Sequence, residues 1–201
     1  PETIQQVIEQ QISLLPPPAV TALSQASVLG REFDVAVLAF LRNQDEGTTE
    51  EEFEPAISAG LIQSLRPGRY RFSHVLYRDV LYQGLGNTTR EELHIQCASY
   101  LRSLIDDGAK DRWSMYAVHL QAAGSGHRND AVAAWKMAAE RAHARLAYEE
   151  AAQCLQKALD AFGQGPKFDP VTRSKLQLQC AFALLLAGHI QMGQEHCREV
   201  F

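Results

Sequence analysis

The chain has 201 residues, of which 46% are hydrophobic and 21% charged, and its formal net charge is −5. This composition is typical of a folded globular protein and excludes collagen-like and highly charged disordered chains. No apolar run approaches the ~20 residues of a membrane-spanning helix, and the N-terminus has no basic region followed by an apolar one. We therefore expect a cytoplasmic protein without a membrane partner. Because it begins without Met and ends inside a helical pattern, we expect a piece of a longer protein.

The apolar spacing predicts four helices in the first third of the chain, over residues 2–15, 19–30, 33–41 and 50–61. The run LPPP at 15–18 ends the first of them, because proline cannot continue a helix interior but can open the next helix. Gly30 suits the C-terminal end of the second helix. Asp34 is expected to cap the third helix, and Thr48 or Thr49 the fourth.

Two short strands are predicted around Pro67-Gly68, a pair that suits the central positions of a type II turn. Three helices followed by a β-hairpin is the order of a winged helix-turn-helix. The sequence therefore predicts a winged-helix domain over residues 16–88, preceded by a helix within residues 1–15. A further helix follows the hairpin, since apolar residues recur at helical spacing from Val75 to Leu85.

Residues 89–201 show no strand pattern, and successive helices are expected at 90–106, 112–124, 129–146, 148–162, 170–187 and 190–201. Bulky and small residues follow the spacing of tetratricopeptide-like helical hairpins. One repeat begins at Val132 (Trp135, Ala139, Tyr148, Ala151, Ala158), and a second begins at Ser174 (Ala181, Gly188, Ile190, Gly193). The offset between them is 42 residues, and the loop at 163–170 supplies the extra length. Residues 98–131 match the spacing poorly and are expected to be a degenerate first repeat. The alternative to repeats is a generic alanine-rich bundle.

The fold class predicted is thus mainly α: a winged helix with a small β-hairpin, then tetratricopeptide-like hairpins. No P-loop, GxSxG or HExxH motif occurs, so we expect no enzymatic activity from these residues alone. The four cysteines have no CxxC spacing and are expected to be reduced thiols, at Cys97, Cys154, Cys180 and Cys197. His189 and His196 are seven residues apart without a third ligand at suitable spacing, so no metal site is expected.

Charge argues against DNA binding, the usual role of a winged helix. Residues 1–88 carry eleven acidic and six basic side chains. The helix before the hairpin is acidic, and no Lys or Arg lies between Arg42 and Arg66. Phosphate contacts supply most non-specific affinity for DNA, so such a helix would be repelled. Arg66, Arg69 and Arg71 on the hairpin favour DNA only weakly, and a DNA-binding regulator remains the alternative.

His74 lies where the strand pattern gives way to the helix pattern, and Ser73 is a candidate N-cap. A histidine in the first turn of a helix lies at its electropositive end, where a phosphate is readily bound. The alternative is a structural histidine whose ring is satisfied by the backbone, which is the more common role.

Four stretches resemble one known family: LSQASVLGREFD, AGLI, YRFSHVLYRDVLYQGL and REELHIQCASYL. Together they resemble the region that follows the ATPase module in signal-transduction ATPases with numerous domains (STAND proteins), in particular bacterial ones joined to cyclase or transcription-regulator domains. The resemblance covers nearly the whole chain. It implies that residues 1–15 link to an upstream ATPase module, and that ATP or ADP binds the parent protein but not this fragment alone.

The same resemblance gives His74 a role. In plant disease-resistance and apoptosome proteins, the histidine of a Met-His-Asp motif contacts the β-phosphate of ADP and holds the closed state. His74 is similar in position, while Val75 replaces the aspartate, whose role is not carried over. His94 is expected to be structural. The winged helix would then be an autoinhibitory lid, and the repeats an arm for an unknown protein or small-molecule effector. The remaining alternative is a plain repeat interaction module in which His74 is inert.

Overall fold

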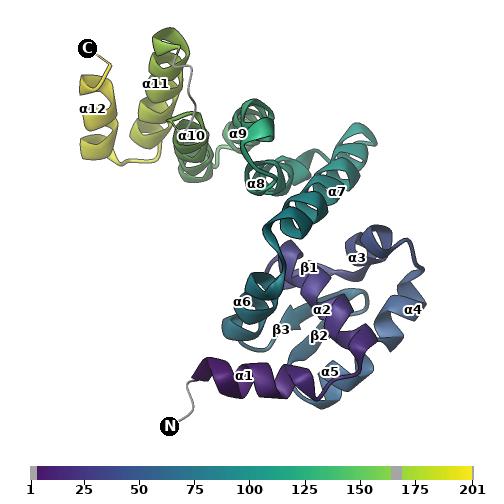
Figure 1. Ribbon diagram of the computed structural model, residues 1–201. Coiled ribbons are helices and arrows are strands. Elements are labelled where there is room, and N and C mark those ends of the chain that lie inside the picture. The colour runs from purple at the N-terminus through teal and green to yellow at the C-terminus, as the bar shows by residue number, and fades with distance from the viewer. Residues whose placement is uncertain (1–3, 164–168, 201) are drawn as a thin grey trace. The chain divides into compact units, whose positions relative to one another are not determined.

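A computed structural model describes residues 4–163 and 169–200. By packing, the chain divides into two units, Pro1–Tyr100 and Leu101–Phe201. The first combines helices with a small antiparallel sheet, and the described part of the second is built of helices alone (Figure 1). The prediction of a mainly helical chain with helical hairpins is confirmed. The winged-helix and tetratricopeptide interpretations, and the boundaries at 15/16 and 88/89, stay predictions.

The first unit contains six complete helices and three strands among its described residues, and a seventh helix begins in it. In chain order they are α1 (Ile4–Ser13), α2 (Pro17–Leu29), β1 (Glu32–Asp34), α3 (Val35–Arg42), α4 (Glu46–Glu51), α5 (Glu54–Ser58), β2 (Ile62–Arg66), β3 (Arg69–Phe72), α6 (Val75–Gly84) and α7 (Asn87–Asp106). The predicted ends of the second helix are confirmed: Pro17 opens α2, and Gly30 follows it with φ of 118°. Few side chains other than glycine adopt that backbone conformation.

The sheet has three strands in the order β1-β3-β2, all antiparallel. The predicted hairpin is present as β2 and β3, with Gly68 at a positive φ of 74° in the turn. Strand β1 was not predicted, and the expected helix over 33–41 is wrong at its start: Phe33 pairs with Tyr70 in the sheet, and α3 begins at Val35. The Val35 N–H donates to the carbonyl of Gly68 at 2.8 Å, so the turn and the helix start support each other.

The predicted fourth helix over 50–61 is also wrong, because it is two short helices, α4 and α5. Pro55 lies in the first turn of α5 and has no N–H to donate to the preceding turn. The cap is Asp45 rather than Thr48 or Thr49: its carboxylate accepts from the backbone N–H of Thr48 at 2.8 Å. Asp34 occupies the N-cap position of α3 as predicted but makes no capping hydrogen bond.

An aromatic cluster fills the core of the first unit between the sheet and the helices. The ring of Phe33 lies 5.4 Å from that of Phe72 and 5.7 Å from that of Phe53, measured between centroids. Tyr70 joins the cluster at 5.1 Å from Phe53, and its hydroxyl donates to Glu50 at 3.0 Å. Burial, followed by the bond and charge of Glu50, raises the pKa of Tyr70 to about 12. The acidic helix is thereby tied to the sheet.

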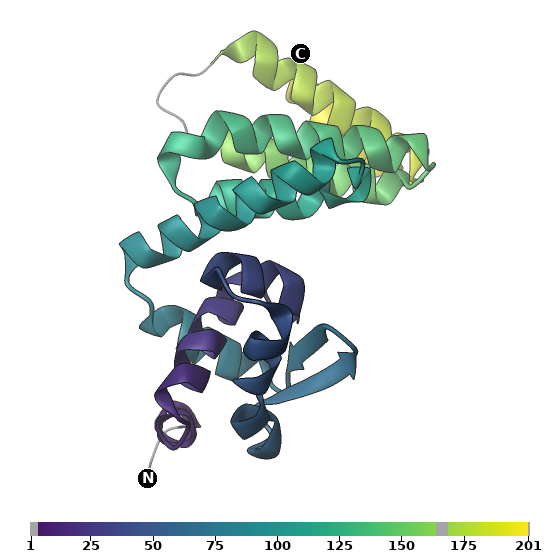
Figure 2. The same cartoon turned by 90° about the vertical axis from the view of Figure 1, so that its right-hand side faces the viewer.

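The described part of the second unit is a row of helices, each packed against the next (Figure 1); Figure 2 looks along this row. They are α8 (Trp113–Ala122), α9 (Arg128–Ala144), α10 (Tyr148–Gly163), α11 (Pro170–Leu186) and α12 (Ile190–Arg198). The predicted helix ranges are confirmed to within a few residues at each end. Most of the loop expected at 163–170 lies outside the described residues.

Small side chains allow these helices to approach closely, at the places that the repeat spacing predicted. Ala139 of α9 is buried, as are Ala151 and Ala158 of α10. At Gly193 a Cβ atom would lie 2.8 Å from Cγ of Leu185, which is too close for any larger residue. Trp135 is buried, and its indole N–H donates to Gln121 at 3.1 Å.

Candidate functional site

His74 is exposed at the junction of β3 and α6, and it is itself the N-cap of α6. The expected cap at Ser73 is therefore wrong. The Leu76 N–H donates to Nδ1 of His74 at 3.2 Å. A ring nitrogen that accepts a hydrogen bond carries no proton, so in neutral imidazole the proton is on Nε2. The backbone contact thus engages Nδ1 and leaves Nε2–H as the remaining donor of this exposed side chain.

The helix that follows His74 is anchored to two other helices of the first unit. The Tyr77 hydroxyl donates to Gln11 of α1 at 2.7 Å. Nε of Arg78 donates to the Ser27 carbonyl, at the end of α2, at 2.8 Å. Both anchors lie within the first turns of α6. The position of His74 is therefore set by α1 and α2 as well as by the sheet.

His94 of α7 lies in the interior of the first unit and is only 3% exposed. Its Nε2 is 3.0 Å from the hydroxyl of Tyr82, whose ring also faces the guanidinium of Arg78 at 4.4 Å. Burial, with smaller contributions from Arg78 and Arg90, lowers the pKa of His94 to about 4. The ring is therefore neutral near pH 7, and it holds α7 against α6 by packing and hydrogen bonding.

The hairpin arginines are largely engaged by neighbouring side chains. Arg69 pairs with Glu32 at 3.2 Å and with Asp34 at 3.3 Å, both on the unpredicted strand β1. Nη2 of Arg71 donates to Gln63 at 3.1 Å. The two carboxylates offset the positive charge of Arg69, whereas the neutral amide of Gln63 leaves the charge of Arg71 in place. The geometry thus adds to the sequence argument against DNA binding.

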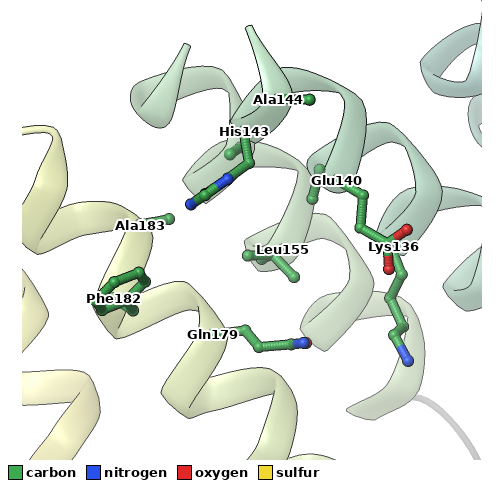
Figure 3. Close-up of a pocket in the computed structure, with 10 residues that line it drawn as sticks. Lys136, Glu140, His143, Ala144, Leu155, Gln179, Phe182 and Ala183 are labelled. Carbon is green, nitrogen blue, oxygen red and sulfur yellow. The ribbon is translucent and has the colours of Figure 1, made fainter. Parts of the chain in front are cut away.

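A pocket of about 310 Å³ opens on the second unit between α9, α10 and α11 (Figure 3). Leu155 of α10 lies at its centre, and alanines complete its floor. Lys136 and Glu140 of α9 line one side. The rings of His143 and Phe182 line the other, with centroids 6.5 Å apart and planes inclined by 23°.

The sequence reasoning did not find this pocket. It aligned the two repeats at an offset of 42 residues to locate buried small residues. The same offset relates exposed positions, since Lys136 corresponds to Leu178 and Glu140 to Phe182. Reading those exposed positions would have shown a charged surface on α9 beside an apolar one on α11. The pocket itself depends on the spacing between the helices, which the sequence does not give.

The described residues hold no group of three or more His, Cys, Asp or Glu side chains placed to bind a metal ion. Cys97, Cys154 and Cys180 are buried free thiols, and Cys197 is a half-buried one. A bilayer-spanning helix needs a long apolar stretch, and none of the helices in the described part of the chain has one.

No family model matches the chain. An uncharacterized protein of Rhizobium meliloti (strain 1021) is 26% identical over 186 residues, which cover 88% of this chain and 17% of that protein. The chain therefore spans about a sixth of the length of the curated relative that it matches. Among solved structures, a STAND protein with a tetratricopeptide repeat sensor from Pyrococcus horikoshii is similar, with a TM-score of 0.44 and 14% identity. The likeness covers the whole of this chain and 34% of that one.

Proposed function

We propose that this chain is a regulatory and scaffolding segment of a multidomain cytoplasmic signal-transduction ATPase. The first unit is a winged-helix lid on an ATPase module elsewhere in the parent protein, and His74 senses the phosphate of bound ADP. The second unit is a tetratricopeptide-like arm that receives a protein or small-molecule effector. The segment itself carries no catalytic residues, and the nucleotide belongs to the parent ATPase module.

One observation supports the sensor role above the others: the imidazole of His74 is exposed, and a backbone N–H engages one of its two ring nitrogens. The Leu76 N–H donates to Nδ1, so Nε2–H is the ring nitrogen that is left to donate to a ligand. A donor that is fixed before binding loses little conformational entropy when a phosphate oxygen accepts from it. A purely structural cap would need only the Nδ1 contact and would not require the other nitrogen to face solvent.

The arm role is supported by the pocket on the second unit. Its floor is apolar, and its rim carries charged and amide groups, a combination typical of ligand sites. An effector that binds there shifts the parent protein toward its active state only if it binds that state more tightly. The proposal therefore requires the affinity of the arm for its effector to differ between the ADP-bound and ATP-bound proteins.

The sensor role is tested by nucleotide retention in the full-length parent protein. We expect the wild type to co-purify with ADP and the His74→Ala variant to lose most of it. His189→Ala, which removes an exposed histidine of the second unit, is the matched control and should retain ADP. Equal retention in all three proteins would leave the chain as an interaction module in which His74 is a structural cap.

A further inference from the structure

The two charged residues of the pocket rim are adjacent but do not satisfy each other. Lys136 and Glu140 lie one turn apart on α9, and neither makes a hydrogen bond or ion pair with another described residue. Lysine placed before glutamate at this spacing is the less favourable orientation for a pair within a helix. The rim therefore offers a cation and an anion side by side, with no net charge.

The opposite side of the pocket is suited to an apolar group. Phe182 is 57% exposed, an unusual state for so large an apolar side chain. On the helix surface it is flanked by Leu178 and Leu186, which are 40% and 42% exposed. Within the pocket, the rings of Phe182 and His143 form an apolar wall beside the floor at Leu155 (Figure 3). Covering this wall removes apolar surface from water, which stabilises a complex by ~25 cal/mol per Å².

The volume limits the size of the ligand. Pockets for small molecules range from about 300 to 1,000 Å³, so a cavity of about 310 Å³ is at the lower end. It suits a single small metabolite rather than a nucleotide or a large cofactor. A ligand with a net negative charge would approach the Glu140 carboxylate unfavourably, and a net positive one would approach Lys136 unfavourably. A neutral ligand with both charges meets neither penalty.

We infer that the pocket binds a free α-amino acid with a large apolar side chain. Its carboxylate accepts from the ammonium group of Lys136, and its own ammonium group donates to Glu140. Its side chain lies over Leu155 against the ring of Phe182. The amide of Gln179, at the same rim, supplies one further donor and acceptor. This inference rests on the proposed role of the second unit as a ligand-binding arm, and it names the class of effector.

The test is calorimetric titration of the chain with L-phenylalanine and L-leucine, and with two derivatives that each lack one charge. N-acetyl-L-phenylalanine lacks the ammonium group, and L-phenylalaninamide lacks the carboxylate. We expect each derivative to bind about tenfold more weakly than the free amino acid, since each loses one charged hydrogen bond. Glu140→Gln should weaken the binding of L-phenylalanine by a similar factor. It should not weaken the binding of the N-acetyl derivative, whose carboxylate the variant no longer repels. Lys136→Met should likewise weaken the binding of L-phenylalanine, and it should not weaken the binding of L-phenylalaninamide.

Arg141→Gln is the matched control, because it removes a charge from the same helix outside the pocket lining; it should bind like the wild type. Phe182→Ala should weaken the binding of L-phenylalanine and of both derivatives by the same factor. No binding of either amino acid at about 10 mM, or equal binding of the N-acetyl derivative, would overturn the inference.

A second titration, with terminally blocked apolar peptides and read from the amide signals of the pocket residues, separates the two proposals. If the peptides bind and the free amino acids do not, the inference of an amino-acid ligand is refuted, but the proposed role of the second unit as an effector-binding arm is retained. If neither kind of ligand moves those signals, the amino-acid inference is refuted and the arm role loses the pocket as its supporting observation.

Discussion

Acid should weaken the first unit through one buried histidine. His94 is neutral in the folded protein because burial and two nearby guanidiniums lower its pKa from 6.5 to about 4. In the unfolded chain the same ring takes up a proton below pH 6.5. Its contribution to stability is therefore complete above pH 6.5, declines as the pH falls from 6.5 toward 4, and is constant below that.

The magnitude follows from the difference between the two pKa values. Each unit of pKa difference corresponds to ~1.4 kcal/mol, so the full loss is about 3 kcal/mol. Between about pH 8 and pH 5 the loss is about 2 kcal/mol, because the titration is then only partly complete. Carboxylates contribute little to the pH dependence in that range, since most of them titrate at lower pH.

The assay is hydrogen exchange of buried amides in α2 and α7, which reports the opening free energy of this unit. His94→Gln should be less stable than the wild type at about pH 8, because packing around the ring is lost. The difference between the two proteins should shrink by about 2 kcal/mol at about pH 5, where only the wild type suffers from the buried histidine. Gln96→Ala, at an exposed position of the same helix and without an ionisable group, is the control. A stability difference that stays constant from pH 8 to pH 5 would refute this account of His94.

Two further predictions concern packing and nucleic-acid binding. Gly193→Ala should destabilise the second unit by about 1–3 kcal/mol, since the new methyl group would lie 2.8 Å from Leu185 Cγ. Gly126→Ala is the control and should not destabilise it, because the space around Gly126 is open. Tryptophan fluorescence during thermal unfolding measures both variants, and equal melting temperatures would contradict the close approach of α11 and α12. At about 150 mM salt the chain should not bind duplex DNA, and Arg69→Ala should change nothing; salt-sensitive binding that this variant weakens would restore the DNA-binding alternative.

The sequence predicted helices well where the apolar period was long. The helices of the second unit were located closely because alanines and large apolar residues recur over three or more turns. The errors occurred in short segments. Strand β1 has only three residues, too few to show a period, and it forms because β3 presents an unpaired edge to it. Pro55 marks the interruption between α4 and α5, but the apolar spacing predicted a single helix across it.

The candidate site was predicted in part. His74 could be located from the change of period at the junction, but its capping contact depends on a φ of −131° that the sequence does not specify. The pocket depends on how α9, α10 and α11 pack, so the sequence patterns did not single out Lys136, Glu140 or Phe182. Side chains that converge from different helices are visible only once the helices are in place.

The central claim is that His74 recognises the β-phosphate of ADP. The most direct measurement compares the affinities of ADP and AMP for the full-length parent protein, in the wild type and in His74→Ala. The account predicts that the wild type prefers ADP and that the variant loses about tenfold of that preference, with AMP affinity unchanged, because only ADP has the phosphate that Nε2–H would contact. The same ADP-to-AMP ratio in both proteins would contradict it.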